Sequence, residues 1–525
     1  MPDFLLPVVD FLKANIHWIA LAFVIHNVVL GTCGLLIYLE RKVASWAQDR
    51  IGPNRVGFDL GIIGFLKGFR FLGLGQSLAD GIKMFTKEDY RSPNTDRFLF
   101  TIAPMIMMVV VVVSIAVIPW GGTHGKRIAA IDITSSLTQG VTVSEIVANK
   151  IVPGRKLVGD VQITFINPDA QQQADPAFIL TTANVIRDAK GDVLPGGLPP
   201  LPTGAAAYVS WVEGWRFQIA DLNIGVLFIL SILSLAVYGV VIGGWASNNK
   251  YSFLGGLRAT ANMISYEIPL GLSVLAIVIM FGTLNLGDIV THQTHYWLGV
   301  IPAWNVFAQP LCFIMFLVCI HAEANRAPFD IAEAEQELVG GYHTEYSSMR
   351  FGLFFLAEYA GMITTSAVCV ALFFGGWHLP FVEYVPFIGQ YFDQPAPGVY
   401  ENLLINIFNA GVFFAKTALI LFVFMWVRWS LPRFRFDQII TLAWRMMIPI
   451  ALGLLFVAAI GVYFTGGRTI NGLNGRDAIV FLAGNLLVAV LALAIHGLLP
   501  KQEHTNKRIK IVGSRYATTP LPAGA

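Results

Sequence analysis

The sequence predicts an all-α integral membrane protein, a tilted bundle of about nine transmembrane helices. Three observations support this fold class. Only 13% of the 525 residues are charged, whereas soluble domains average roughly 25%. The mean hydropathy is +0.64. The apolar residues also come in long runs, each close to the ~20 residues that a helix needs to cross a bilayer.

Nine apolar segments fit that length. They are 16–39, 98–118, 222–243, 262–282, 302–322, 350–374, 403–427, 439–464 and 477–499. The first is predicted to be a membrane helix that stays in the protein, because the N-terminal stretch lacks a basic n-region and an A-x-A cleavage site. The ninth is apolar nearly all round and is expected to be a peripheral structural helix.

The four cysteines, Cys33, Cys312, Cys319 and Cys369, lie in apolar runs and form no C-x-x-C pair. We therefore expect no iron–sulfur cluster, zinc site or disulfide framework. The chain has no G-x-x-x-x-G-K-[ST] motif and no convincing G-x-G-x-x-G between a strand and a helix. The net charge of +2 says little about partners, and no nucleic-acid partner is expected.

The distribution of lysine and arginine predicts the orientation. Loop 40–97 carries ten of these residues, and loops 283–301 and 375–402 carry none. The positive-inside rule then places the N-terminus outside and the C-terminal tail, 500–525, in the cytoplasm. The five basic residues of that tail fit anionic lipid headgroups. Loop 323–349 lies on the cytoplasmic side as well.

Loop 40–97 contains a predicted amphipathic helix near residues 76–87. Leu78, Ile82 and Phe85 recur at spacings of four and three, and Lys83 lies off that stripe. This pattern fits a helix at the membrane surface. A helix that packs its stripe on the bundle fits the pattern equally well.

Residues 121–215 differ in composition and predict a small, partly β insertion on the outer face. VQITF (161–165) alternates like a strand, IRDAKGDV (186–193) resembles a hairpin with a Lys-Gly turn, and 194–204 is a stiff linker. The insertion is interpreted as a cover over neighbouring subunits. The predicted units are 1–120 and 216–465 in the membrane, the insertion 121–215, the extra helix 466–499 and the tail 500–525.

Between residues 323 and 349 the chain carries six carboxylates and one arginine, Arg326, for a formal charge of −5. Pro328 is suited to the first turn of a helix. A helix over 328–338 would place Asp330, Glu333 and Glu337 on one face and Glu335 on the opposite side. Carboxylates this close resist ionising together and can share protons as a relay. The alternative is that Asp330 and Glu333 only complement the helix dipole.

Ionisable residues within membrane spans are costly and usually mark a pathway or a partner. Glu40, Glu267, Glu358 and Lys416 lie within or at the ends of predicted spans. Glu40 and Glu267 have the alternative of extending to the interface, and a structural ion pair is an alternative for Glu358 and Lys416. Several arginines lie at predicted cytoplasmic helix ends: Arg41, Arg50, Arg258, Arg428, Arg433 and Arg435. The positive-inside rule alone accounts for them, and the alternatives are that they dock an acidic soluble partner or orient a polar headgroup at the membrane surface.

Four long motifs resemble the H subunit of NADH-quinone oxidoreductase, a membrane component of respiratory complex I. In chain order they are YLERKVASWAQDRIGPNRVG, GLRATANMISYE, HAEANRAPFDIAEAEQELVGGYHTEYSSMRFGLFFLAEY and WVRWSLPRFRFDQ. The resemblance covers residues 1–120 and 216–465. The segment 121–215 and the ninth helix depart from the eight helices that are usual in this family.

The resemblance implies a subunit of a proton-pumping NADH:quinone oxidoreductase, located in a bacterial plasma (inner) membrane at the joint of the membrane and peripheral arms. Quinone, either ubiquinone or menaquinone, would be the substrate. NADH, FMN and the iron–sulfur clusters would be held by other subunits. The expected partners are the peripheral-arm subunits with the quinone site and the terminal iron–sulfur cluster, the small membrane-arm subunits, and membrane lipid.

The resemblance also implies two sets of site residues. The proton or charge path would comprise Glu40, Glu267, Glu323, Glu333, Glu335, Glu337 and Glu358. The quinone chamber would involve Arg41, Arg50, Asp80 and Arg326, whereas Arg258, Arg428 and Arg433 would be structural or docking residues. No metal ligand is implied.

Two other functions remain open. A secondary ion transporter is favoured by Glu267, Glu358 and Lys416 in predicted spans, although we see no internal repeat. The membrane subunit of a hydrogenase-type complex is the other alternative, without quinone chemistry. The length of the ERK…RIGPNRVG and RAPFDIAEAEQE matches favours the quinone enzyme.

Overall fold

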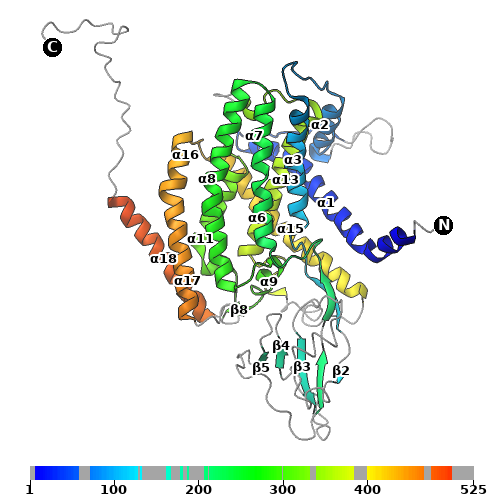
Figure 1. The fold of residues 1–525 in the computed structure, drawn as a ribbon, viewed down its shortest axis with the longest axis vertical. Helices are drawn as coiled ribbons and strands as arrows, with labels where there is room; N and C mark the ends of the chain where they lie inside the picture. Colours follow the sequence, from blue (N-terminus) through cyan, green and yellow to red (C-terminus); the bar gives the residue numbers. More distant parts are fainter. Residues whose placement is uncertain are drawn as a thin grey trace, which may run out of the picture.

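The computed structural model of the chain is a bundle of long helices with a small β module at one end (Figure 1). It describes residues 6–57, 71–127, 131–132, 161–166, 178–180, 186–188, 206–210, 212–297, 300–331, 339–382, 399–465 and 475–498. The predicted all-α membrane fold with a partly β insertion is confirmed.

Within those residues, eight helical segments are long and apolar enough to cross a membrane. They are α1 (Leu6–Trp46), α3 (Arg97–Ile115), α6 with α7 (Gly225–Ser234 and Ala236–Ala246), α8 (Lys250–Phe281), α13 (Ser348–Phe373), α15 (Val399–Ser430), α16 with a π-helical turn and α17 (Phe436–Leu442, Ala443–Met447 and Ile448–Phe464), and α18 (Gly475–Leu498). Each coincides with one of the predicted spans.

The remaining predicted span, 302–322, is shorter than expected. The apolar helix here is α11 (Pro310–Glu323), with 14 residues and a length of about 21 Å at 1.5 Å per residue. It follows the single turn α10 (Asn305–Ala308), and Gln309 between them has non-helical dihedral angles. Pro310 starts α11 because proline has no N–H to continue the preceding turn. The described residues therefore contain eight segments of full spanning length, and α11 is a shorter apolar helix beside them.

Polar side chains define where several helices begin. The Asp96 carboxylate accepts hydrogen bonds from the amides of Phe98 and Leu99 at the start of α3. Asn249 accepts one from Tyr251 at the start of α8, and Asn285 accepts two at the start of the short helix α9 (Leu286–Thr291). These caps satisfy amide groups that would otherwise lack a partner at each helix end.

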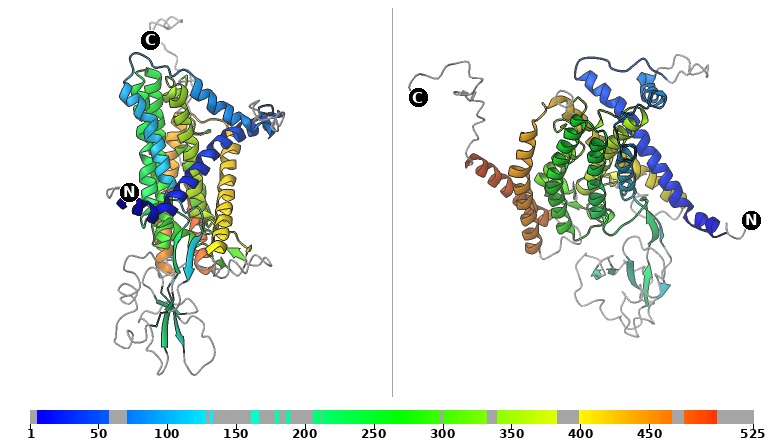
Figure 2. Two further views of the ribbon diagram at one scale, coloured as in Figure 1. Left: turned by 90° about the vertical axis from the view of Figure 1, so that its right-hand side faces the viewer. Right: turned by 45° about the horizontal axis from the view of Figure 1, so that its top comes forward.

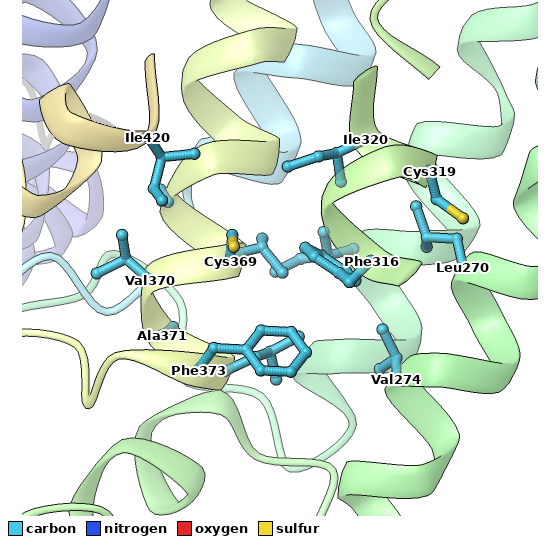
Figure 3. Close-up of a cluster of buried hydrophobic side chains, with 14 of the residues drawn as sticks. Leu270, Val274, Phe316, Cys319, Ile320, Cys369, Val370, Ala371, Phe373 and Ile420 are labelled. Atoms are coloured by element: carbon cyan, nitrogen blue, oxygen red, sulfur yellow. The ribbon is translucent and has the colours of Figure 1, made fainter. Parts of the chain in front are cut away.

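The core of the bundle lies where α8, α11, α13 and α15 meet. Figure 3 shows Leu270 and Val274 of α8 beside Phe316 of α11 and Phe373 of α13. All four cysteines are buried and unpaired. The α7–α8 contact depends on glycine, because a Cβ atom on Gly244 would lie 2.7 Å from the carbonyl oxygen of Ser252.

The β module consists of a ribbon and a sheet. The ribbon pairs β1 (Thr123–Arg127) with β7 (Val212–Arg216). The antiparallel sheet has the order β2-β6-β3-β4-β5, with strands β2 (Ile131–Asp132), β3 (Val161–Ile166), β4 (Phe178–Leu180), β5 (Ile186–Asp188) and β6 (Ala206–Ser210). The strand predicted at 161–165 is therefore confirmed. β5 pairs with the preceding β4, whereas residues 189–205, with the predicted Lys-Gly turn and linker, lie outside the described residues. A last short hairpin joins β8 (Tyr296–Trp297) to β9 (Ile301–Pro302).

The β module and the helix α2 (Gly75–Thr86) lie at opposite ends of the bundle, and α1 crosses the bundle obliquely (Figure 2). α2 continues from a short turn, Phe71–Gly73. Its end is tied to the start of α13, where the Ser348 hydroxyl donates to the Met84 carbonyl at 3.0 Å. The acidic loop ends at this point, so it lies at the end opposite to the insertion, as the predicted topology requires.

The apolar stripe of α2 faces away from the bundle. Leu78, Ile82 and Phe85 are 46%, 48% and 73% exposed, whereas the Ser77 hydroxyl donates to the Gly34 carbonyl of α1. Of the two interpretations of this amphipathic pattern, the exposed stripe favours a helix at the membrane surface over one that packs its stripe on the bundle.

The close approach of α7 and α8 predicts that Gly244→Ala destabilises the protein, by roughly 1–3 kcal/mol, because the added methyl group meets a backbone carbonyl that cannot move aside. Gly271→Ala in α8 is the matched control, since a Cβ atom there meets nothing within 4 Å, and it should be neutral or slightly stabilising. The measurement is the heat-induced aggregation midpoint in detergent-solubilised membranes, read by immunoblot. Equal midpoints for the two variants would contradict the packing described here.

Candidate functional site

Glu40 lies at the centre of a buried group of charges. It is in the last turns of α1, where the apolar run ends, and is only 7% exposed. Arg428 from the end of α15 and the Tyr359 hydroxyl from α13 each donate a hydrogen bond to its carboxylate. A second guanidinium, that of Arg326, lies 3.6 Å away. Glu40 is therefore held inside the protein and does not extend to the interface.

Arg326 joins this carboxylate to a second one. Its Nε atom lies 3.0 Å from the Glu358 carboxylate of α13, and its guanidinium lies over the Tyr359 ring at 4.4 Å from the ring centroid. Arg326 is 4% exposed. Glu40, Arg326, Glu358 and Arg428 form what we call the charge cluster, with two negative and two positive residues. Buried charges are tolerated when they are paired in this way.

The position of Arg326 depends on the turn that follows α11. The amide of Phe434, in the α15–α16 connection, donates to the Pro328 carbonyl at 3.1 Å, and the Arg433 guanidinium donates to the Asp330 carbonyl. The Phe329 ring packs between the rings of Tyr266 and Phe434. The chain beside Arg326 is thus fastened to a distant segment.

The predicted helix start at Pro328 is wrong for the residues that the structure describes. Residues 327–331 form turns and bends. The physical reason is that local and tertiary hydrogen bonds shape this segment: the Ile331 amide donates to the Phe329 carbonyl, and the Pro328 and Asp330 carbonyls accept hydrogen bonds from Phe434 and Arg433. Residues 332–338 lie outside the described residues, and with them the predicted site residues Glu333, Glu335 and Glu337.

A wide cavity of about 500 Å³ opens beside Glu40. Its walls come from α1, α13, α15 and the segment after α1: Ile37, Glu40, Arg41, Ala44, Ser45, Pro53, Phe355, Tyr359, Arg428 and Trp429. Arg41 pairs with Asp80 of α2 at 2.6 Å, and Gln76 donates to the same carboxylate. The wide cavity therefore combines two arginines with aromatic walls.

A narrow cavity of about 50 Å³ adjoins the charge cluster at Glu358. Glu323 and Glu358 line it together with Asn325, Tyr342 and Thr365. Its volume is enough for one or two water molecules. Glu358 therefore contacts Arg326 and also forms part of the wall of the narrow cavity.

Glu267 extends the series of carboxylates into the bundle. It lies on α8 within electrostatic range of Glu323 and accepts a hydrogen bond from the Ser234 hydroxyl of α6. The structure thus brings together Glu40, Arg326, Glu358, Glu323 and Glu267. Arg50 is exposed and does not line either cavity.

The sequence interpretation missed two residues of this site. Tyr359 contacts both Glu40 and Arg326, and the only sequence signal was its place directly after Glu358. Arg428 was assigned to structure or docking, yet it hydrogen-bonds Glu40 and lines the wide cavity. Its partner is 388 residues away in the chain, so no local pattern could indicate the contact.

Lys416 has a structural environment. Its ammonium group donates to the carbonyls of Phe374, Gly376 and His378 at 2.6–3.0 Å and lies over the Trp304 ring. Gln293 and Asn305 donate to the Ala371 and Leu372 carbonyls of the same helix end. Gln293 and Asn305 thus satisfy two carbonyl groups of the last turn of α13, and Lys416 satisfies the C-cap carbonyl of Phe374 and two carbonyls of the turn that follows. A positive charge at this helix end is favourable.

Comparison with known proteins gives a consistent result. The family model described as NADH dehydrogenase matches residues 19–152 and 193–459. The chain is 38% identical to an H subunit of NADH-quinone oxidoreductase from Cytophaga hutchinsonii, over 79% of this chain and 87% of that protein. It is 35% identical to "NADH-quinone oxidoreductase subunit 8" of Rhodothermus marinus over 85% of this chain and 98% of that protein. It is 33% identical to the H subunit of Salinibacter ruber, over 86% of this chain and 97% of that protein. The family match reaches into both ends of the segment 121–215, further than the motifs indicated.

The cap on α13 predicts that Lys416→Met destabilises the protein by roughly 3 kcal/mol, because three part-buried carbonyls lose a charged donor. Thr417→Val is the matched control: Thr417 is the next residue of α15 and is buried, but its hydroxyl bonds only within that helix, so the loss should stay below about 1 kcal/mol. Heat-induced aggregation midpoints in solubilised membranes would measure both. A Lys416→Met midpoint as high as that of Thr417→Val would exclude the capping role.

Proposed function

Because the chain belongs to the NADH dehydrogenase family, with H subunits of NADH-quinone oxidoreductase among its relatives, we propose that its charge cluster couples quinone reduction in the wide cavity to proton translocation through the bundle. The chain is a multi-pass membrane subunit of this oxidoreductase complex. The observation that carries the proposal is that one buried arginine, Arg326, contacts both Glu40 in the wall of the wide cavity and Glu358 in the wall of the narrow one.

The chemistry of the wide cavity fits a quinone headgroup. Its volume lies in the roughly 300–1,000 Å³ range of small-molecule pockets. Arg41 and Arg428 offer guanidinium donors to carbonyl oxygens, and Phe355 and Trp429 offer flat apolar walls to a ring. Arginine suits this task because it stays charged and presents a rigid set of donors. Asp80 would orient Arg41 through their ion pair.

The charge cluster offers a route from that headgroup into the bundle. A quinone that is reduced to quinol takes up two electrons, supplied by other subunits, and two protons. A proton gained or lost at Glu40 changes its attraction for Arg326. Because Arg326 is shared, the same change alters how strongly the guanidinium holds Glu358. Water in the narrow cavity, Glu323 and Glu267 would carry the response further.

Glu333, Glu335 and Glu337 are proposed as path residues on the family resemblance alone. Arg50 is proposed near the quinone chamber on the same ground. The proposed setting is a bacterial plasma (inner) membrane, with the N-terminus outside and the C-terminus cytoplasmic. The proposed partners are the peripheral-arm subunits with the quinone site and the terminal iron–sulfur cluster, and the small membrane-arm subunits. Ubiquinone or menaquinone would be the substrate.

The structure gives less support to the secondary-transporter alternative. That interpretation was based on three ionisable residues in predicted spans, Glu267, Glu358 and Lys416. The three carbonyl contacts and the Trp304 ring account for this lysine as a helix cap. The hydrogenase-type alternative involves no quinone chemistry. The arginine-lined cavity, which fits a quinone headgroup, therefore favours the quinone enzyme over it.

Glu358→Gln should lower the rates of quinone reduction and proton pumping together, at least tenfold. The substitution removes the carboxylate charge that links Arg326 to the narrow cavity. Glu345→Gln is the matched control: this carboxylate, in the loop that precedes α13, accepts a hydrogen bond from Asn249 and lines neither cavity, so both rates should stay within about twofold. Both activities are measured in sealed vesicles and normalised to assembled complex. Normal coupled turnover in Glu358→Gln would refute the proposed path.

Arg41→Ala should raise the KM for short-chain quinone about tenfold, the effect of losing one hydrogen bond from a charged donor of about 1.4 kcal/mol. Lysine at this position should restore only part of the affinity, because it lacks the planar donor fork. Lys83→Ala, which removes an exposed cation of α2, serves as the control and should leave KM unchanged. Similar KM values for Arg41→Ala and Lys83→Ala would leave Arg41 outside the binding site.

A further inference from the structure

Tyr359 contacts two members of the charge cluster, Glu40 and Arg326, and neither the motifs nor the family comparison assigns it a role. Its hydroxyl donates to Glu40, and its ring lies beneath the guanidinium of Arg326, 4.4 Å from centroid to Cζ. It is 3% exposed. A hydrogen bond and a cation–π contact therefore meet on one rigid side chain.

The neighbouring aromatic residue does not duplicate these contacts. The Phe355 ring is 5.8 Å from the same guanidinium, it has no hydroxyl, and it lines the wide cavity one helical turn earlier. Among the described residues, Tyr359 is the aromatic side chain that touches Arg326 and hydrogen-bonds a carboxylate of the cluster.

The sequence order Glu358–Tyr359 explains how one helix serves both cavities. Consecutive residues of a helix point about 100° apart. Glu358 lines the narrow cavity and Tyr359 lines the wide one, and both contact Arg326. Arg326 therefore connects Glu40 to Glu358, and Tyr359 contacts both Glu40 and Arg326.

We propose that Tyr359 is a positioning residue with two separable functions: its hydroxyl orients Glu40 towards the wide cavity, and its ring holds Arg326 between Glu40 and Glu358. This inference rests on the proposed function. The hydroxyl acts on the quinone side, so its loss changes substrate affinity. The ring acts on the shared arginine, so its loss changes the transfer from one cavity to the other.

Two substitutions separate these functions in the assembled complex. Tyr359→Phe keeps the ring and removes the hydroxyl, so it should raise the KM for short-chain quinone about threefold to tenfold, the range for one hydrogen bond, with kcat and protons pumped per electron unchanged. Tyr359→Leu removes both contacts and should also lower kcat and the number of protons pumped per electron. Rates are normalised to the amount of assembled complex, which separates these effects from loss of folding.

Tyr346→Phe provides the matched control. Tyr346 is another buried tyrosine, stacked on Phe100 at 3.9 Å, and its hydroxyl has no hydrogen-bond partner in the described structure. Burial raises the pKa of this hydroxyl, so it remains neutral. Removal of the Tyr346 hydroxyl should leave KM, kcat and pumping unchanged.

A thermal-stability cycle tests the contact independently of quinone chemistry. Tyr359→Phe, Glu40→Gln and the double variant are compared by their unfolding midpoints in the complex, and the hydroxyl–carboxylate contact predicts that the two losses are not additive. Three results would each overturn the positioning role. The first is additive losses of midpoint in the cycle, and the second is the same rise in KM for Tyr346→Phe as for Tyr359→Phe. The third is equal losses of kcat in Tyr359→Phe and Tyr359→Leu. Non-additive midpoints with unchanged quinone kinetics in Glu40→Gln would support the positioning role and contradict the proposed function instead.

Discussion

Arg326 is held between two buried carboxylates that belong to different helices, and the arrangement of the surrounding helix ends depends on this interaction. Each buried ion carries a desolvation cost of several kcal/mol that only close pairing offsets. Glu40 comes from α1, Glu358 from α13 and the second cation, Arg428, from α15. These three helices must therefore meet at one level. The turn after α11 must also present Arg326 there, which the contacts of Phe434 and Arg433 ensure.

The sequence was sufficient for the membrane fold because long apolar runs have few alternatives in a bilayer. The predicted spans all appear as helices, and the alternating VQITF segment appears as β3. The prediction was wrong where local backbone chemistry decides. In 302–322 the hydropathy indicated a full span, but Pro310 starts a new, shorter helix. At Pro328 proline was compatible with a helix start, but residues 327–331 form turns and bends, and their Pro328 and Asp330 carbonyls accept tertiary hydrogen bonds from Phe434 and Arg433.

The site was predictable in composition but not in connectivity. Charged residues in apolar runs are few, so Glu40, Glu267 and Glu358 stood out. Glu323 and Arg326 stood out as part of the acidic loop, and the motif resemblance grouped all five. Which cation meets which carboxylate depends on the packing of helices far apart in the sequence, as with Arg428 and Glu40. Lys416 shows the converse, because a cation in a span indicated a pathway whereas its contacts are those of a helix cap. Tyr359 was missed because tyrosine in an apolar helix has no distinctive sequence signal.

The central claim is that Arg326 couples the charge state of Glu40 to that of Glu358, because both carboxylates interact with the same guanidinium. A double-mutant cycle in the assembled complex tests this claim most directly. Arg326→Gln, Glu358→Gln and the double variant are compared by the thermal midpoint of the protein within the complex. Arg326→Gln alone should destabilise the protein by about 3–5 kcal/mol, because two buried carboxylates lose their shared cation. The double variant should recover at least about 1 kcal/mol of that loss, since one uncompensated charge is gone. Strictly additive losses would contradict the account, because Arg326 and Glu358 would then act independently.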